Sequence, residues 1–472
     1  MGEHFDLVVI GAGSGEAVVD DALSHWRVAV VERADFGGTC LNRGCIPSKM
    51  FVHPADVAVL AHDGPRLGVR STAEGVDWTA VRDRVIGRVD AASRDGEETY
   101  AEKPHVTVLK GTARFTGERR LVVTLADGDV EMTADRVVLA TGSHPVVPDI
   151  PGLADAGYLT SDDVMRTERL PDRVGVLGGG YVGSEFAHVL ASYGARVTQV
   201  DSAPMLLTNQ DAEISERFTA AVRERRDVRL ETSLERVSGT GPHTMHLSDG
   251  SSVEVDAILV AVGRKPASDG LGLEHAGVAV SEDGRVVVDE HLRTTAEGVW
   301  ALGDLSSDVP LKHVANADAR VVHHNLLHPD DLRSADHDHV PNAVFAHPQV
   351  ASVGLTEAQA REQGIDLAVG RREYADVAFG WALQHDPDDD AVEAAGLVKL
   401  LADRRTGLLV GAHLIGEQAA ILVQPLVQAM ALGTPVRGLA RAQYWIHPAL
   451  TEVVENALIE LEQDLESGPD TA

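Results

Sequence analysis

Cysteine is scarce in this chain of 472 residues, which contains only two. Cys40 and Cys45 stand five positions apart, so a structural disulfide between them would close a short loop and stabilise the fold little. Zinc needs four ligands, and no further cysteine or histidine follows at the spacing of a zinc finger. The sequence therefore predicts either two thiols that form and break one disulfide, or a buried and inert pair.

Positive charge and long apolar runs are also scarce. The chain has 41 Lys and Arg against 73 Asp and Glu, and this net charge of −32 argues against nucleic acid or an anionic membrane as a partner. No apolar run approaches the about 20 residues that a membrane helix needs. The first expected strand begins by Phe5, so we expect no signal peptide. With two reactive thiols and no other cysteine, we expect a cytoplasmic protein.

A glycine-rich turn follows the first apolar run of the chain. The run Phe5–Ile10 is short enough for a buried strand, and the turn Gly11–Glu16 leads into a segment that we expect to be helical through Asp21. A second apolar run, Val28–Val31, ends in Glu32. A strand, a glycine turn, a helix, a strand and an acid in this order are typical of a dinucleotide-binding βαβ unit.

Single positions in this first turn have physical roles. Gly11 permits the tight turn, and Gly13 lets the backbone approach a pyrophosphate at a helix N-terminus. Glu32 is placed to accept a hydrogen bond from a ribose hydroxyl. Glu16 occupies the third glycine position, so the match is imperfect, and the turn alone is equally compatible with an ordinary turn.

A second unit of the same kind lies in the middle of the chain. The run Val174–Leu177 leads into Gly178–Gly183, which has the full glycine spacing of the fingerprint. Residues 184–193 are predicted to be helical, and residues 196–200 form a predicted strand that ends in Asp201. Two such units indicate two bound dinucleotides.

Three further apolar runs end in glycine or in an acid. Each is compatible with an ordinary strand end, but together they indicate that the chain returns to the carboxyl edges of two sheets, where ligands bind. These runs are Val137–Gly142, Ile258–Gly263 and Val299–Asp304.

From the cysteine segment Gly37–Lys49 to the C-terminal segment His447–Glu452, the chain resembles the flavoprotein disulfide reductases, the family of glutathione reductase and dihydrolipoamide dehydrogenase. The C-terminal segment resembles the family's catalytic His-Pro-x-x-x-Glu sequence. The cysteine motif alone fits dihydrolipoamide dehydrogenase and the mycothione reductase subfamily equally well. Four segments resemble the mycothione reductase subfamily most: Lys49–Val52, Lys312–Asn316, Tyr374–Trp381 and Gln443–Leu450.

The resemblance implies an α/β protein with two Rossmann-like dinucleotide-binding domains, one for FAD and one for NAD(P), and a C-terminal α+β dimerisation domain. The polar tail 467–472 is expected to be disordered. The expected segments are an FAD-binding part over 1–147, an NAD(P)-binding domain over 148–267, a return to the FAD-binding domain over 268–338 and an interface domain over 339–472.

The resemblance also assigns cofactor residues, because a flavin couples a hydride donor to thiol chemistry. For FAD it implies Gly11, Gly13, Gly15, Glu32, Gly38, Thr39, Lys49, Ala113, Thr141, Gly142, Gly303, Asp304, Lys312, His313 and Ala315. For NAD(P) it implies Gly178, Gly180, Tyr181, Val182, Gly183, Glu185, Asp201 and Gly263.

The implied catalytic residues begin with the two cysteines. By resemblance Cys45 faces the flavin and Cys40 faces the substrate. Lys49 favours a thiolate and a flavin anion through its charge, and it pairs with Glu185. The alternative is that Lys49 and Glu185 are ordinary solvated charges on two helices.

His447 and Glu452 complete the implied set. Imidazole titrates in the range that thiol–disulfide exchange needs, and Glu452 would orient the ring and raise its basicity. In the family this histidine reaches the disulfide of the partner subunit, which implies a homodimer with a shared active site. The alternative is a surface histidine that precedes a proline at a turn.

The end of the second unit's second strand bears on the choice of nucleotide. Asp201 can bind a ribose diol and repels a 2′-phosphate, and no Lys or Arg occurs over 197–216. We therefore expect NADH in preference to NADPH, although mycothione reductases by resemblance would use NADPH.

The expected activity is an NAD(P)H- and FAD-dependent reduction of a small disulfide, with mycothione as the expected substrate. Dihydrolipoamide dehydrogenase, a component of a multienzyme complex, is one alternative. A non-enzymatic flavoprotein that only binds or senses is another, and the intact cysteine and histidine set argues against it. Three histidines fall in the polar stretch 328–340, which we interpret as an exposed connection and not as a metal site: His328, His337 and His339.

Overall fold

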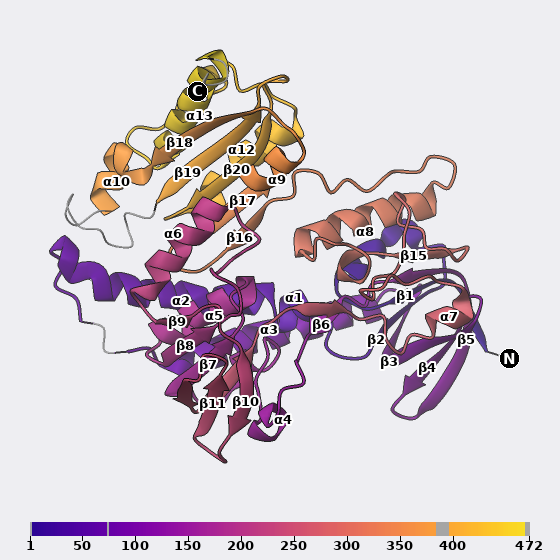
Figure 1. The fold of residues 1–472 in the computed structure, drawn as a ribbon. Coiled ribbons are helices and arrows are strands. Elements are labelled where there is room, and N and C mark those ends of the chain that lie inside the picture. The colour runs from indigo at the N-terminus through magenta and orange to yellow at the C-terminus, as the bar shows by residue number, and fades with distance from the viewer. Residues whose placement is uncertain (1, 73–74, 384–395, 468–472) are drawn as a thin grey trace.

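The computed structural model describes residues 2–72, 75–383 and 396–467. Its elements form three bodies, each built on its own sheet (Figure 1). The sheet that contains β1 lies to the right in Figure 1, the sheet that contains β7 lies at the lower left, and the C-terminal sheet lies above the second.

The first body is a parallel sheet in the order β3-β2-β1-β5-β15, and β4 pairs antiparallel with the extended ends of β3 and β5. β1 lies between β2 and β5, and ligands collect at such a switch point beyond the carboxyl ends of the strands. The late strand β15 returns the chain to this sheet. The strands are β1 (Glu3–Ile10), β2 (Val28–Glu32), β3 (Val106–Gly117), β4 (Arg120–Leu125), β5 (Gly128–Leu139) and β15 (Val299–Ala301).

Helices cover this sheet and connect it to the second body. The long α2 begins at the second cysteine and packs against α5 of the second body. The helices and 3-10 turns are η1 (Ser14–Val18), η2 (Asp21–Leu23), α1 (Gly38–Asn42), α2 (Cys45–Asp63), η3 (Gly64–Leu67), α3 (Trp78–Ala101), α7 (Leu273–Ala276), η5 (Gly303–Leu305) and α8 (Lys312–Leu327).

The prediction of one continuous helix after the first glycine turn is wrong. The segment folds as the two short 3-10 turns η1 and η2, with an extended break at Val19. The Asp20 side chain accepts the backbone N–H of Ala22 and starts the second turn. An Asp that binds the backbone locally and β-branched valines both disfavour a continuous helix, which explains the difference.

The second body contains the parallel sheet β13-β7-β8-β9, with β7 between β8 and β13. A three-stranded antiparallel sheet lies beside it, and the ribbon β6–β14 joins the first and second bodies. The predicted helix at 184–193 begins three residues earlier, at Tyr181. The elements are β6 (Ser143–Pro145), α4 (Leu153–Ala156), η4 (Val164–Arg166), β7 (Arg173–Leu177), α5 (Tyr181–Ser192), β8 (Arg196–Val200), α6 (Ala212–Arg223), β9 (Asp227–Arg229), β10 (Leu234–Ser238), β11 (His243–Leu247), β12 (Ser252–Val255), β13 (Ala257–Val260) and β14 (Arg264–Pro266).

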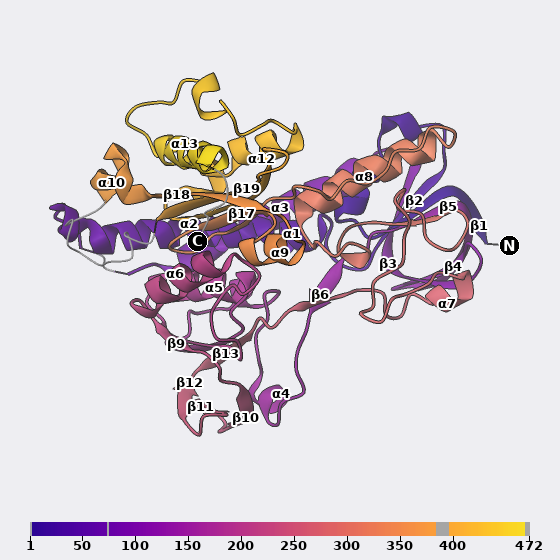
Figure 2. The same ribbon diagram turned by 45° about the horizontal axis from the view of Figure 1, so that its top comes forward.

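The third body is an antiparallel sheet in the order β16-β17-β20-β19-β18. α12 and α13 lie on one face of this sheet and α6 of the second body lies on the other (Figure 2). The elements are β16 (Asn342–Val344), β17 (Val350–Gly354), α9 (Glu357–Glu362), β18 (Leu367–Glu373), η6 (Tyr374–Asp376), α10 (Ala378–Leu383), β19 (Leu397–Asp403), β20 (Leu409–Ile415), α11 (Ala419–Leu422), α12 (Gln424–Ala431), η8 (Ala440–Ala442) and α13 (Thr451–Ser467).

This architecture confirms the expected fold class. The expected disorder at the C-terminus is wrong for Ser467, which ends α13, and residues 468–472 lie outside the described part of the chain. Within the described residues, no helix is long and apolar enough to cross a membrane. The bounds proposed for the four segments stay predictions.

Candidate active site

A cavity of about 1040 Å³ opens at the carboxyl edge of the first sheet. The first glycine turn and Glu32 line one part of it, and the two cysteines and Lys49 line another. The chain returns to this cavity after β5, at Thr141, and after β15, at Asp304. The parallel strands thus bring together the ends of segments that are distant in the sequence, as the strand-end glycines predicted.

The first glycine of each turn packs closely against the backbone of a neighbouring strand end. A Cβ on Gly11 would lie 2.3 Å from the carbonyl oxygen of Ala140, and one on Gly178 would lie 2.3 Å from that of Ala261. Both glycines have positive φ, at +105° and +113°. Only glycine adopts this backbone conformation and tolerates this approach without strain.

Backbone N–H groups hold the carboxylates of both acids, Glu32 at the end of β2 and Asp201 directly after β8. Glu32 accepts the backbone N–H groups of Ala12 and Ala34, both at 2.8 Å. Asp201 accepts those of Gly179 and Ala203. Each carboxylate is therefore fixed against its own glycine turn, and its remaining lone pairs are available to a ribose hydroxyl.

Cys40 lies in α1 and Cys45 begins α2, and both are free thiols. A hydrogen bond from Cys40 lowers the pKa of Cys45, and the positive charge of Lys49 adds to this effect. The same hydrogen bond, together with burial, raises the pKa of Cys40. Cys45 is therefore the thiol that loses its proton first, and Cys40 needs a base.

Lys49 and Glu185 form an ion pair between α2 and α5. The Lys49 Nζ lies 2.9 and 2.7 Å from the two carboxylate oxygens, and the Glu185 side chain is only 9% exposed. Glu185 also accepts the backbone N–H of Phe345 at 3.0 Å, and the Lys49 Nζ lies 4.9 Å from the centre of the Phe345 ring. The pair thus joins all three bodies, which excludes the alternative of two independent solvated charges.

The His447 Nδ1 lies 2.8 Å from the Glu452 Oε1, and the other Glu452 oxygen accepts the backbone N–H of Ala449. Glu452 therefore fixes the ring, as expected. The His447 side chain is 73% exposed, and it lies outside the cavity that contains the cysteines. Tyr444 and Ile446 beside it are also largely exposed. The single chain does not bring His447 to Cys40 or Cys45.

The other predicted cofactor residues divide into three groups. Gly13, Gly38, Thr39, Ala113, Thr141, Gly142, Gly303, Lys312 and Ala315 line the cavity, as do Tyr181, Val182 and Glu185 of the second unit. Gly180, Gly183, Asp201 and Gly263 lie outside its lining, with Gly178, around the second glycine turn. Gly15 is buried and is not part of the lining, and His313 is exposed, with its Nε2 2.9 Å from the carbonyl oxygen of Pro341. The placement of His313 does not bring it to the cavity.

The polar residues that line the cavity and that the sequence interpretation missed include Ser14, Ser143 and Arg264. Ser14 accepts a hydrogen bond from the Lys312 Nζ at 3.0 Å. Ser143 donates to Asp304 at 2.6 Å and accepts from Arg264 at 2.8 Å. Each lies in a glycine turn or directly after a strand-end glycine. That position in the sequence could have identified them as residues of the site.

His337, one of the three histidines in the stretch 328–340, has a partner within the protein. Among the residues that the structure describes, no three His, Cys, Asp or Glu side chains form a group suited to a metal ion. His337 instead contacts the buried Asp318, with its Nε2 2.7 Å from the carboxylate.

Residues 5–319 match the pyridine nucleotide-disulphide oxidoreductase family, and residues 340–458 match its dimerisation domain. Mycothione reductase of Mycobacterium tuberculosis is 45% identical over 471 residues, which cover 97% of this chain and 100% of that protein. Dihydrolipoyl dehydrogenase of Mycobacterium leprae is 33% identical and covers 96% of this chain and 97% of that protein. The Cu(II) complex of the flavoprotein disulfide reductase RclA from Escherichia coli has a TM-score of 0.86 at 31% identity, with 97% of this chain and 99% of that chain covered.

These matches confirm the resemblance inferred from the sequence, and they extend over both dinucleotide units and the C-terminal sheet. The chain belongs to the pyridine nucleotide-disulphide oxidoreductase family and is an NAD(P)H-dependent flavoprotein disulfide oxidoreductase.

Proposed function

We propose that this enzyme reduces the low-molecular-weight disulfide mycothione to mycothiol, with electrons that pass from NADH through FAD to the Cys40–Cys45 pair. The observation that carries the chemistry is the cysteine pair, which lines the large cavity beside the Lys49–Glu185 ion pair. The 45% identity to a mycothione reductase over almost the whole chain supports the substrate.

The residues of the cavity fit FAD. A Cβ on Gly38 would lie 2.8 Å from the Cα of Gly13, so Gly38 admits no side chain there, and glycines at this turn let backbone N–H groups approach a pyrophosphate. Glu32 is held at the position where it can bind a ribose hydroxyl. Elsewhere in the cavity, Asp304 supplies a negative charge and Lys312 a positive charge. When bound there, FAD would couple the two-electron donor to the redox chemistry of the disulfide.

In the proposed exchange, the thiol of Cys40 loses its proton to His447 of the partner subunit and attacks the substrate disulfide. One S–S bond breaks as a mixed disulfide with Cys40 forms, and the first substrate thiolate leaves and takes the proton back from the imidazolium. The Cys45 thiolate then attacks the Cys40 sulfur, so the second substrate thiolate leaves and the Cys40–Cys45 disulfide forms. Lys49 stabilises the Cys45 thiolate before this step.

The proposed partner is a second copy of the chain. His447 is exposed and is not part of the lining of the cavity in its own chain, and it lies next to α13 in the segment that matches a dimerisation domain. A two-fold interface would give two equivalent sites, each made from both subunits. The strong negative charge supports neither nucleic acid nor an anionic membrane as a partner, and the reactive thiols favour the cytoplasm.

The proposed preference for NADH rests on Asp201. Its carboxylate is fixed by two backbone N–H groups and would repel a 2′-phosphate at short range. The NAD(P) residues and the catalytic roles given above are part of the same proposal.

One assay tests the function. The purified enzyme is given NADH or NADPH with mycothione, lipoamide or glutathione disulfide, and nucleotide oxidation is followed. We expect the highest kcat/KM with mycothione and NADH. Preferred turnover of lipoamide would contradict mycothione as the substrate. It would favour the alternative that the enzyme is a dihydrolipoamide dehydrogenase, a function that the 33% identical relative carries in its name.

A further inference from the structure

The segment that follows β8 frames the second glycine turn from both ends. Asp201, at its start, accepts the N–H of Gly179, and Leu207 donates its own N–H to the Gly179 carbonyl at 2.9 Å. Gln210, at its end, donates to the hydroxyl of Tyr181 at 2.6 Å. Tyr181 and Val182 are the residues of this turn that line the large cavity. The position of the segment therefore determines the position of the turn.

Gln210 is in turn held by the third body. It is only 5% exposed, its oxygen accepts from Ser352 at 2.7 Å, and its nitrogen also donates to Asn342 at 2.8 Å. The Tyr181 hydroxyl donates to the same Asn342 oxygen at 3.1 Å. Each polar atom of the Gln210 amide has a partner, so the amide has little freedom to change its orientation.

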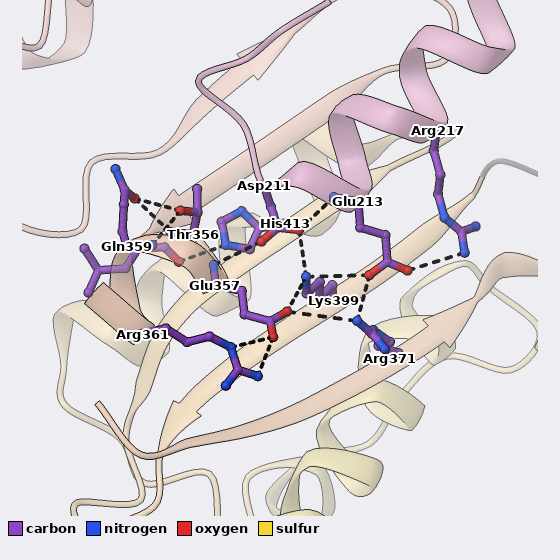
Figure 3. A network of polar contacts seen from close by, with 11 residues as sticks. Asp211, Glu213, Arg217, Thr356, Glu357, Gln359, Arg361, Arg371, Lys399 and His413 are labelled. Atoms are coloured by element: carbon purple, nitrogen blue, oxygen red, sulfur yellow. Dashed lines mark hydrogen bonds and ion pairs between the residues drawn. The ribbon is translucent and has the colours of Figure 1, made fainter. Parts of the chain in front are cut away.

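A buried lysine holds the next residue along the chain. The Lys399 Nζ lies 2.7 Å from Asp211 and 2.7 Å from Glu357, and 3.6 Å from Glu213 (Figure 3). Lys399 is 3% exposed and the Asp211 side chain 2%. Asp211 also accepts the backbone N–H of Glu357 at 3.0 Å. Lys399 lies on β19 and Asp211 caps α6, so this contact fixes the second body to the third.

We propose that Lys399, acting through Asp211 and Gln210, is a positioning residue for the nicotinamide nucleotide. It keeps Tyr181 and the second glycine turn at a fixed place relative to the third body. Glu185, which accepts the backbone N–H of Phe345 of that body, lies four residues after Tyr181 on the same helix, so both contacts hold α5 against the third body. This inference rests on the proposed nucleotide site at that turn.

The chain offers a matched control at the same junction. Arg217, farther along α6, makes two hydrogen bonds of 2.7 and 2.6 Å to Glu373 at the end of β18. Figure 3 shows Arg217 at the outer edge of the network, on the side away from Asp211. Arg217 also lies 3.6 Å from Glu213, so its removal weakens the same contact between bodies and loosens Glu213, but it removes none of the contacts that link Lys399 through Asp211 and Gln210 to Tyr181.

The test compares Lys399→Met, Gln210→Met and Arg217→Met with the wild-type holoenzyme. NADH and NADPH affinities are measured by titration calorimetry, and KM and kcat are measured separately. We expect Lys399→Met and Gln210→Met to weaken nucleotide binding and raise its KM roughly tenfold, because small misplacements have large effects on binding geometry. Arg217→Met should keep the wild-type Kd and KM even where its Tm falls.

A second measurement separates the two half-reactions. Each variant is reduced chemically and then mixed with the disulfide substrate, and we expect wild-type rates because this step uses no nucleotide. Equal nucleotide Kd values in all variants, with only Tm changed, overturn the inference. If Lys399→Met fails to fold, the nucleotide Kd and KM of Gln210→Met test the inference instead. A wild-type protein that binds neither nucleotide overturns the proposed function instead.

Discussion

Lys49 and Glu185 form a contact of 2.7 Å that joins the helix beginning at Cys45 to the first helix of the second dinucleotide unit. A cation is thereby held four residues after the thiol of Cys45 and one helical turn away from it. The carboxylate that holds this cation is nearly buried and has a second partner in the Phe345 N–H. The pair therefore links the electrostatics of the cysteines to the packing of the three bodies.

Removal of this cation should make Cys45 harder to ionise. In Lys49→Met, the pKa of Cys45 rises because the favourable charge is lost. The pH profile of iodoacetamide alkylation in the reduced enzyme should therefore move to higher pH. The buried Glu185 also loses its partner, so the stability should fall by about 1–3 kcal/mol, measured by urea unfolding. Lys49→Arg serves as a control that keeps the charge, and an unchanged alkylation profile in Lys49→Met would contradict the assigned role.

The two cysteines should differ when each is replaced by serine. Both variants should lose disulfide reduction and keep FAD. Only Cys40→Ser should retain a thiolate beside the flavin, seen as a long-wavelength absorption band, because Cys45 has the lowered pKa. The same band in Cys45→Ser, and its absence in Cys40→Ser, would mean that the two roles are reversed.

Nucleotide preference should change at Asp201. Asp201→Arg exchanges repulsion of a 2′-phosphate for a charge-assisted contact and should raise kcat/KM for NADPH relative to NADH. Because Asp201 also accepts the Gly179 N–H, Asp201→Asn is the matched control that keeps a hydrogen-bond acceptor. A wild-type enzyme with higher kcat/KM for NADPH than for NADH would end this hypothesis.

Glu16 should make stability depend on pH. Burial raises its pKa to about 7 from 4.5, against the lowering effects of the Gly37 N–H and Lys312 and with a further rise from Glu32. Between these two values the folded state binds more protons than the unfolded state, so this stability contribution is complete below pH 4.5 and is lost as pH rises through 7.

Glu16→Gln removes this charge and keeps an acceptor for Gly37. It should be more stable than the wild type at pH 8 by up to about 3 kcal/mol and close to it at pH 5. Urea unfolding of the holoenzyme at both pH values measures the difference, with the exposed Glu118→Gln as a control. An equal change in stability at both pH values would show that titration of Glu16 is not the cause.

Catalysis should require two subunits. The His447→Ala and Cys40→Ser proteins are each expected to be nearly inactive as homodimers. After subunit exchange, a mixed dimer carries one site with both changes and one with neither, so activity should return. Exchange is followed with differently tagged subunits. If exchange occurs and no activity returns, His447 acts within its own chain.

Local sequence patterns were sufficient to predict most strands and helices of the two dinucleotide units. The runs Phe5–Ile10 and Val174–Leu177 are strands, as predicted, because a short and mostly apolar run that ends at a glycine turn has few alternatives in an α/β fold. The helix expected after Gly11–Glu16 failed because Asp20 hydrogen-bonds the backbone locally. That competition depends on side-chain geometry, which periodicity does not contain.

By itself, the sequence determined the two glycine turns with their acids and the closely spaced cysteine pair, since these depend on spacing along the chain, and the resemblance of these motifs to a known family indicated the fold class. Tertiary structure alone decided that Ser143 and Arg264 line the cavity, and it supplied the contact between Lys49 and Glu185 that the family resemblance had implied. It also decided that Lys399 is buried against Asp211, 188 residues away in the chain. These contacts join different sheets, and the relative placement of sheets depends on how whole faces pack, which no single segment encodes.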